Sequence, residues 1–511
     1  MSNLSDFLGG SGGGGDPQAT FQASANVSAN DLVALMNNGT IKPVNSDNVT
    51  IDFGAEQYVN GPYASQQSAN GKQSKAFYDP AQDKWILLFL LQNADMYIMT
   101  ASVSGSTVTI QANGGSTYEY YSSTRGFDAC WDSASGQVVV TTIQTNDYAT
   151  LSSIYWSGTN NRYQRTASTT WAGASHQGDA AFIAENGDGT GIAIHNYSST
   201  SGRCVAWTNA ANANPPSVTN GGGNDVLSTY PTVSTSKWGV LWNIADKTYA
   251  CMYHTHINGD TRFRIITDSG TSVSGGGAIN PFMQGFAAGL STFAYNPNTK
   301  TAVIGIVQQT NNAYWKTFTF NGQTPSTPAN LGSVPLGNQY TAITYSSYQD
   351  KFVAFCQSNS PASTFEIATF DVDSTGVCQN VNRDSDTFSH PNTGSTLFEF
   401  PSISASEGSN DKIFVFGNNN ADNNEYVIAG SPPYLDTNVD KYFGQATEAI
   451  TSGSTGAVSI INRSVDLLGN TFQKGQKLFA NPSGSALATS GTYRVGYATD
   501  GDTVLVTGEP S

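Results

Sequence analysis

The chain has 511 residues, only 12% of them charged, and its 38 acidic and 22 basic side chains give a net charge of −16. This balance argues against a nucleic-acid partner and against docking on anionic lipid, because both need a basic surface. No apolar run is long enough to insert into a membrane. The first residues have neither the basic nor the apolar region of a signal peptide, so we expect synthesis and assembly in a cytoplasm.

Residues 1–20 predict a flexible peptide, because Gly-rich segments behave as flexible coil and four consecutive glycines stand here. Two interpretations remain open. The segment is either a disordered tail or an anchor peptide, in which Leu4, Phe7 and Leu8 insert into the groove of a partner.

Residues 21–44 predict a small module with two short strands around an Asn-Gly turn, which is a strong hairpin signal. Residues 48–54 resemble the outermost strand expected for the first of the repeats described next.

A unit of roughly 50 residues, built only of strands, recurs along the middle of the chain. Its clearest copy ends one strand in Tyr78-Asp79, passes through a polar turn, and continues as an apolar strand from Trp85 to Leu91. A strand that is apolar on both faces is buried on both faces. The equivalent strands begin near residues 85, 138, 192, 249, 302, 352 and 413.

Seven such units predict an all-β fold, a seven-bladed β-propeller over residues 45–441. Each unit shows a third strand, whereas the fourth strands are weak in sequence, as exposed edge strands often are. The last unit has no fourth strand of its own after Ala429. We therefore expect residues 49–53 to supply it and to close the ring between the first and last blades.

Residues 442–511 no longer follow the repeat and consist of short strands separated by glycine turns. They predict a small β-barrel or β-clip. The segments that carry a resemblance are SANDLVALMNNGTIKPV near the start, and AITSGSTGAVSII, GQKLFAN, GSALA and YRVGYATDGDTVLV near the end.

These segments, with the initial LSDFLGG, resemble modules of virion structural proteins of tailed phages, especially marine ones, of the tail-fibre, adhesin or decoration type. The resemblance covers about 110 residues. It implies a virion component with no catalytic residue. It also suggests that residues 21–44 and 442–511 fold together as a mount domain that carries the propeller as an insert. Other virion proteins are then the expected partners, through residues 1–20 and the terminal domain, with several copies in each particle.

Exposed aromatic residues are the best functional lead, because aromatic rings stack on sugars or protein surfaces while nearby amides form hydrogen bonds. The alternative is that several of them wedge between blades. The candidate binding residues, for a host glycan or protein, are Tyr63, Tyr118, Tyr120, Tyr121, Tyr314 and Trp315.

Catalysis and metal binding find less support. The acidic residues that recur near strand ends are expected to cap turns rather than to form the carboxylate pair of a glycosidase. The pair His254 and His256 lacks a third ligand, and the acidic turns at residues 371–376 and 420–425 do not fit an EF-hand loop. We expect five free thiols, no metal and no cofactor.

The sequence thus predicts a non-catalytic tail fibre or tail-tip protein that adheres to the host surface. Two alternatives stay open: decoration of the capsid or its vertices, and a glycan-cleaving propeller enzyme, such as a depolymerase or a sialidase-like protein. A cellular lectin-like propeller is a third possibility, which the end modules disfavour. A propeller fold by itself does not choose among them.

Overall fold

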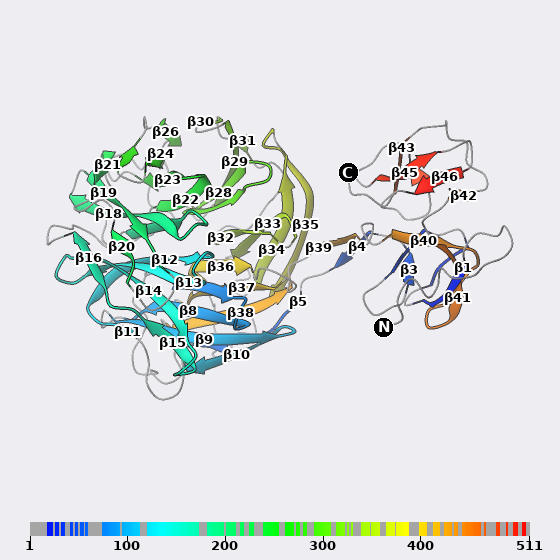
Figure 1. The fold of residues 1–511 in the computed structure, drawn as a ribbon, viewed down its shortest axis with the longest axis horizontal. Helices are drawn as coiled ribbons and strands as arrows, with labels where there is room; N and C mark the ends of the chain where they lie inside the picture. Colours follow the sequence, from blue (N-terminus) through cyan, green and yellow to red (C-terminus); the bar gives the residue numbers. More distant parts are fainter. Residues whose placement is uncertain are drawn as a thin grey trace. The chain divides into compact units, whose positions relative to one another are not determined.

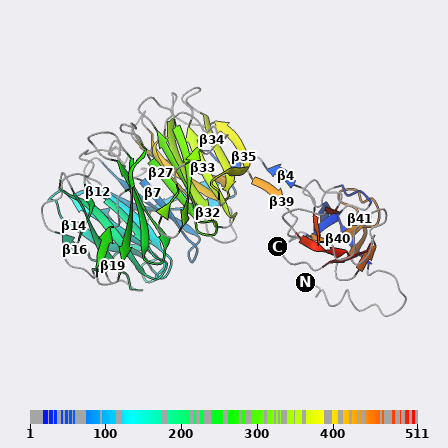
Figure 2. The same cartoon turned by 90° about the horizontal axis from the view of Figure 1, so that it is seen from above.

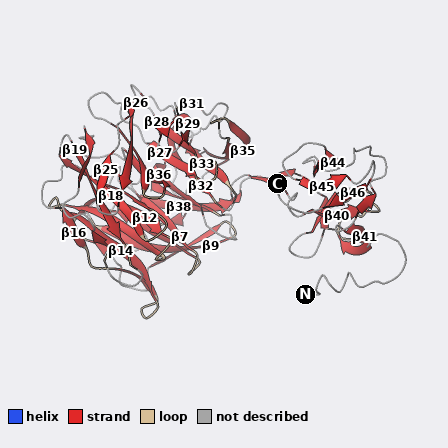
Figure 3. Cartoon of the chain, turned by 45° about the horizontal axis from the view of Figure 1, so that its top comes forward, coloured by secondary structure: helices blue, strands red, loops and turns tan. Residues whose placement is uncertain are grey.

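The computed structural model divides the chain into two compact units, residues 1–49 with 434–511, and residues 50–433. It describes residues 18–23, 26–29, 32–35, 41–43, 46–49, 52–55, 57–59, 74–91, 95–112, 120–172, 181–198, 201–210, 215–218, 224–228, 239–254, 261–269, 272–275, 279–283, 291–307, 313–321, 324–326, 329–330, 339–347, 349–357, 364–373, 375–387, 398–405, 412–419, 424–431, 434–437, 442–460, 464–466, 477–480, 487–488, 494–498 and 503–506. Within these residues every regular element is a strand (Figure 3), and no helix is long and apolar enough to cross a membrane.

The larger unit is a seven-bladed β-propeller, which confirms the predicted fold class. Seven antiparallel sheets follow one another around a ring (Figures 1 and 2), and the innermost strand of each blade contacts the innermost strands of its two neighbours. From blade one to blade seven, these innermost strands are β7 (Ser74–Asp79), β12 (Thr124–Asp132), β17 (Ala181–Glu185), β22 (Gly239–Ala245), β27 (Ser291–Asn296), β32 (Gln339–Ser346) and β36 (Phe398–Ala405).

The second strand of each blade carries the apolar repeat that the sequence shows. Strand β8, for example, is buried at six of its seven positions. Burial on both faces explains why its side chains are apolar without alternation. The second strands are β8 (Lys84–Leu90), β13 (Gln137–Gln144), β18 (Thr190–Ser198), β23 (Thr248–His254), β28 (Thr301–Val307), β33 (Lys351–Gln357) and β37 (Ile413–Asn419).

The third strands lie where the sequence predicts them. They are β9 (Met96–Ser104), β14 (Ala149–Ser157), β19 (Ser201–Thr208), β24 (Thr261–Asp268), β29 (Ala313–Asn321), β34 (Thr364–Val372) and β38 (Asn424–Ser431).

The outer edge of the third strand is covered by two short strands in six blades, an arrangement that the sequence did not reveal. The pairs are β10 (Thr107–Ala112) with β11 (Tyr120–Tyr121), β15 (Arg162–Arg165) with β16 (Thr169–Ala172), β20 (Ser217–Val218) with β21 (Asn224–Ser228), β25 (Val273–Gly275) with β26 (Ile279–Met283), β30 (Thr324–Pro325) with β31 (Ala329–Asn330), and β5 (Asp52–Phe53) with β6 (Gln57–Tyr58). Blade six instead has one long outer strand, β35 (Cys378–Thr387).

The ring is closed by a strand from the start of the chain. Strand β5 pairs with β38, with Phe53 opposite Gly430 and Asp52 opposite Ser431. The structure thus places residues 52 and 53 where the sequence predicts the closing strand, while Val49 belongs to the neighbouring strand β4 (Ser46–Val49). Apolar contacts join the same two blades, since the Trp85 ring of blade one stacks on Phe414 of blade seven with centroids 4.7 Å apart.

The smaller unit joins strands from both ends of the chain. One five-stranded sheet has the order β1 (Gln18–Gln22), β41 (Thr455–Ile460), β40 (Tyr442–Ala446), β2 (Leu32–Leu35) and β3 (Ile41–Pro43). A second has the order β42 (Ser464–Asp466), β46 (Thr503–Val506), β45 (Arg494–Ala498), β43 (Lys477–Ala480) and β44 (Leu487–Ala488). Strand β4 pairs separately with β39 (Tyr434–Thr437).

The division between the units falls at residues 49 and 434, a few residues from the boundaries proposed from sequence. The predicted β-barrel or β-clip for the terminal unit stays a prediction. The anchor residues Leu4, Phe7 and Leu8 lie outside the described residues.

Candidate functional site

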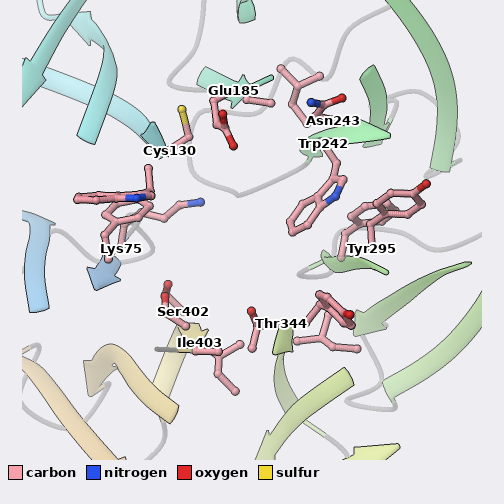
Figure 4. Close-up of a pocket in the computed structure, with 18 of the residues that line it drawn as sticks. Lys75, Cys130, Glu185, Trp242, Asn243, Tyr295, Thr344, Ser402 and Ile403 are labelled. Atoms are coloured by element: carbon pink, nitrogen blue, oxygen red, sulfur yellow. The ribbon is translucent and has the colours of Figure 1, made fainter. Parts of the chain in front are cut away.

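A cavity of about 800 Å³ lies along the axis of the propeller. All seven innermost strands contribute to its lining (Figure 4). Each of these strands is the inner edge of its sheet, so it has no further strand on that side. The cavity is therefore surrounded by strand edges, which carry backbone N–H and C=O groups.

Aromatic residues occupy one equivalent position in five of the seven innermost strands. Each directly precedes the polar residue with which its strand turns toward the second strand, and each lines the cavity. We call this set the aromatic collar: Tyr78, Trp131, Trp242, Tyr295 and Tyr345. Ala184 in blade three and Ser404 in blade seven leave two gaps in the collar.

The polar residue after each collar position fixes the turn that follows. Asp79 accepts hydrogen bonds from the Ala81 and Gln82 amides at 2.9 and 3.3 Å. Asn296 accepts from the Asn298 and Thr299 amides at 2.8 and 3.3 Å in the same way. These bonds satisfy turn amides that the sheet leaves unpaired, and for Asp79 this is the capping role expected from the sequence.

The tyrosines of the collar are held by their hydroxyl groups. Tyr78 donates to Asp83 Oδ1 at 2.8 Å, and Tyr295 donates to the Ile244 carbonyl of the neighbouring blade at 3.1 Å. Tyr345 makes the equivalent bond to Asp350. Burial raises the pKa of both Tyr295 and Tyr345 above the usual value, so these rings stay neutral at physiological pH. Fixed, neutral rings suit stacking against a ligand because little side-chain entropy is lost on binding.

An ion pair lies deeper in the cavity, three residues along the strand from the collar, or ~10 Å at the rise of a β-strand. Lys75 Nζ of blade one is 2.8 Å from Asp128 Oδ1 of blade two. The second oxygen of Asp128 accepts a hydrogen bond from the Ile183 amide of blade three at 3.1 Å. Asp128 therefore connects three successive blades and neutralises the single cation among the described lining residues.

The remaining lining carboxylates are also engaged. Glu185 accepts a hydrogen bond from the Gly187 amide, and Asp246 accepts one from Asn186 Nδ2 at 3.1 Å. Figure 4 shows Glu185 between Cys130 and Trp242, with its carboxylate directed into the cavity.

Cys130 is the cavity residue whose side chain is most often a nucleophile. Its thiol is free and half-buried. Burial, followed by the negative charges of Glu185, Asp128 and Asp132, raises the pKa of Cys130 well above the usual range. Because the thiolate is the reactive form, this environment keeps Cys130 unreactive.

Of the six binding residues predicted from sequence, the structure describes the side chains of two, Tyr121 and Trp315, and neither lines the cavity. Trp315 is only 7% exposed and packs between blades with Phe352 and Phe370, so it has no exposed face for a ligand. Tyr121 is 3% exposed, and its hydroxyl is 2.7 Å from Ser152 Oγ. Both side chains are therefore packed between blades, the arrangement that the sequence left open as the alternative, and the binding role of the six residues stays a prediction. Tyr120 and Tyr314 lie in β11 and β29, but their side chains, and Tyr63 and Tyr118 entirely, fall outside the described residues.

The acidic turn at residues 371–376 is used internally. Asp371 pairs with Lys351 at 2.8 Å. Asp373 accepts from the Thr375 hydroxyl at 2.6 Å and from the Thr375 and Val377 amides, and these hydrogen bonds lower the pKa of Asp373. In the parts of the chain that the structure describes, no three His, Cys, Asp or Glu side chains gather as metal ligands. His256 and the turn at residues 420–423 fall outside those parts.

The signal for the collar was present in the repeat itself. In five copies an aromatic residue precedes the turn, as in Tyr78-Asp79 and Trp242-Asn243. From the sequence these positions are recognisable only as strand ends, because one sequence does not show that the equivalent residues of different blades meet around an axis.

The sequence matches no protein-family model and no curated protein sequence. Among solved structures, a mutant of AofleA from Arthrobotrys oligospora is 8% identical, with a TM-score of 0.39, and covers 72% of this chain and 98% of its own. The fucose-binding lectin of Aleuria aurantia, a six-bladed propeller, is 12% identical, with a TM-score of 0.36, and covers 60% of this chain and 90% of its own.

A putative 6-phosphogluconolactonase from Bacteroides uniformis is also 12% identical, with a TM-score of 0.39, and covers 66% of this chain and 93% of its own. The similar structures thus include a lectin and a putative lactonase. Identities and scores this low carry no information on the ligand or activity of this chain.

Proposed function

We propose that this chain is a tail-fibre or tail-tip component of a tailed-phage virion, and that its propeller binds a glycan on the host surface without chemical change. The aromatic collar carries the binding part of the proposal. Its rings line a cavity large enough for a small ligand, and Thr344 and Ser402 provide hydroxyl groups there (Figure 4). Stacking rings beside hydrogen-bonding groups match the two kinds of surface that a sugar presents.

The virion part of the proposal comes from the terminal segments that resemble phage structural modules. In a particle with several copies, weak individual contacts become tight attachment through avidity.

Binding without catalysis is supported by the contacts of the carboxylates that line the cavity and by the protonated thiol of Cys130. The three lining carboxylates each accept a hydrogen bond or an ion pair, and the thiol of Cys130 is held protonated. A glycosidase needs one carboxyl group as an acid and another as a nucleophile or base. None of the described lining carboxylates stands free for either role.

The test is a glycan array probed with the full-length chain and with two variants. Trp242→Ala removes the collar ring that projects toward the middle of the cavity (Figure 4), and Tyr148→Ala removes an aromatic ring that is 37% exposed and does not line the cavity. We expect Trp242→Ala to weaken binding at least about tenfold, or ~1.4 kcal/mol, and Tyr148→Ala to bind as the unmodified chain does.

Thermal unfolding of each variant checks that it remains folded, since Trp242 also packs 5.6 Å from the Phe293 ring. Equal loss of binding in both variants would contradict the role of the collar. Release of shortened saccharide from the bound glycan would show that the propeller cleaves its ligand, and the protein would then be an enzyme and not an adhesin.

A further inference from the structure

The polar side chains that line the axial cavity fall into two groups. The charged side chains of the described lining all belong to blades one to four. They are engaged within the protein, since Lys75 pairs with Asp128 at 2.8 Å and both Glu185 and Asp246 accept hydrogen bonds. Blades five to seven contribute only neutral side chains to the described lining, and several of these carry hydroxyl groups.

Thr341, in strand β32 of blade six, is a buried residue whose hydroxyl group has no partner. It lines the cavity and is only 3% exposed. Its Oγ1 forms no hydrogen bond within the part of the chain that the structure describes. A buried hydroxyl group without a hydrogen bond costs free energy, because it has lost its contacts with water. We therefore expect a polar group from outside the protein to bind here, either a water molecule or a ligand hydroxyl.

A second hydroxyl group lies on the neighbouring blade. Thr292 of blade five also lines the cavity, and its Oγ1 accepts a hydrogen bond from the Ile343 amide of blade six at 2.9 Å. Ile343 is two residues from Thr341 on the same face of β32, or ~7 Å along the strand. The bond to Ile343 uses only an acceptor site of Thr292, so its hydroxyl proton remains a donor.

Two further hydroxyl groups extend this surface toward the collar and onto blade seven. Figure 4 shows the hydroxyl oxygens of Thr344 and Ser402 directed into the cavity. We call the four residues the hydroxyl wall: Thr292, Thr341, Thr344 and Ser402.

The hydroxyl wall matches a neutral sugar better than a charged one. Hydroxyl groups both donate and accept, as the hydroxyl groups of a sugar do. A carboxylate, phosphate or ammonium group would lose its hydration in the cavity, which is costly without an opposite charge to pair with. Each described charged group of the lining already has a partner within the protein.

We propose that the axial cavity selects a neutral oligosaccharide, with one sugar unit against the aromatic collar and another hydrogen-bonded to Thr341. This inference rests on the proposed function, since it specifies the glycan that the cavity accepts. Thr341 lies four residues from the collar residue Tyr345, or ~13 Å along the strand. This distance is longer than one pyranose ring, so a ligand that reaches both residues has at least two sugar units.

The test is a glycan array that carries neutral, uronic-acid, sialylated and amino-sugar oligosaccharides, probed with the full-length chain and three variants. Thr341→Val removes the hydroxyl group at nearly constant shape, and Thr341→Ser keeps it. Thr109→Val is the matched control, because Thr109 is exposed on β10 and does not line the cavity.

We expect the unmodified chain to bind neutral glycans in preference to the three charged classes. Thr341→Val is expected to weaken this binding about tenfold, because a sugar hydroxyl is then buried without its partner. Thr341→Ser and Thr109→Val are expected to bind the same glycans as the unmodified chain does.

Thermal unfolding of Thr341→Val without glycan gives a second result that does not depend on binding. The substitution removes a buried, unpaired hydroxyl group, so we expect the melting temperature to stay the same or to rise. A clear fall would show that the hydroxyl group serves the fold rather than a ligand, and would overturn the inference.

Preference for charged glycans, or equal binding of neutral glycans by Thr341→Val and the unmodified chain, would overturn the inference as well. The proposed function fails on different results, namely that Trp242→Ala binds as tightly as the unmodified chain or that no array glycan is bound. In either case the inference falls with it.

Discussion

At the scale of single residues, the contact between Tyr163 and Asp79 joins blade one to blade two. Tyr163 is 1% exposed, and its hydroxyl donates to Asp79 Oδ2 at 2.7 Å. Burial and then the negative charge of Asp79 raise the pKa of Tyr163 well above the usual value. Asp79 is itself 3% exposed and holds the turn behind the collar residue Tyr78. The bond therefore connects the stability of the ring to the geometry of the site.

Replacing this tyrosine tests the bond. Tyr163→Phe takes away the hydroxyl donor of a buried carboxylate, and we expect a loss of ~1.5–3 kcal/mol of stability at pH 7. An unfolded tyrosine ionises near pH 10, whereas the folded one stays protonated, so the stability of the unmodified chain falls as pH rises above about 10. The variant lacks this group and should lose less stability over the same range.

Thermal unfolding at pH 7 and at pH 10.5 measures both effects. Tyr148→Phe, at an exposed position, is expected to change neither. An alkaline loss of stability that is identical in Tyr163→Phe and the unmodified chain would show that this bond is not its source.

At the scale of elements, the closing strand β5 has tight steric limits. Gly54 follows it, and the Gly54 amide donates to the Ala429 carbonyl at 3.2 Å. A Cβ atom at residue 54 would lie 1.8 Å from the Ser106 carbonyl oxygen in the β9–β10 turn of blade one. Since the obstacle is backbone, the closing strand would have to move away from its neighbour.

We therefore expect Gly54→Ala to destabilise the propeller by more than ~2 kcal/mol, as strain and overpacking at a fixed site do. Gly158→Ala is the matched control, because nothing lies within 4 Å of a Cβ atom there. Chemical denaturation of the two variants compares them directly. If both are as stable as the unmodified chain, the closing strand does not hold the ring together.

The elements also show what sequence reasoning can and cannot reach. The second strands are buried on both faces, so their apolar runs predict all seven blades from sequence. The last blade lacks a fourth strand of its own in the sequence, which predicts that a strand from the start of the chain, β5, completes it. The pairs of short outer strands could not be predicted from sequence, because strands such as β20 and β30 have two residues each and are too short to show a periodic pattern.

At one turn position, backbone conformation repeats while side chains do not. The residue before the second strand has a positive φ in six blades, at Asp83, Gly136, Gly189, Lys247, Lys300 and Asp350. Only two of these residues are glycine, so the repeat is invisible to a search for glycine turns. The aromatic collar could not be predicted from sequence either, because its members are 50 or more residues apart in the chain and come together only when the ring closes.

At the scale of the whole molecule, the chain combines a ring that contains an axial cavity with a terminal unit built from both chain ends. The strands β1, β2 and β3 share a sheet with β40 and β41. Both connections to the propeller therefore leave from one unit, which suits a domain that presents an inserted head. The aromatic collar lies at the propeller face that carries the turns between first and second strands.

The most direct measurement is a cryo-EM map of the purified phage particle with this chain located in it. The proposed function predicts several copies at the tail, with the collar face of each propeller directed outward toward the host. Copies on the capsid shell would contradict a role in host attachment and would support the alternative that the protein decorates the capsid. Copies whose collar face is buried against the particle, or particles without this chain, would contradict the central claim.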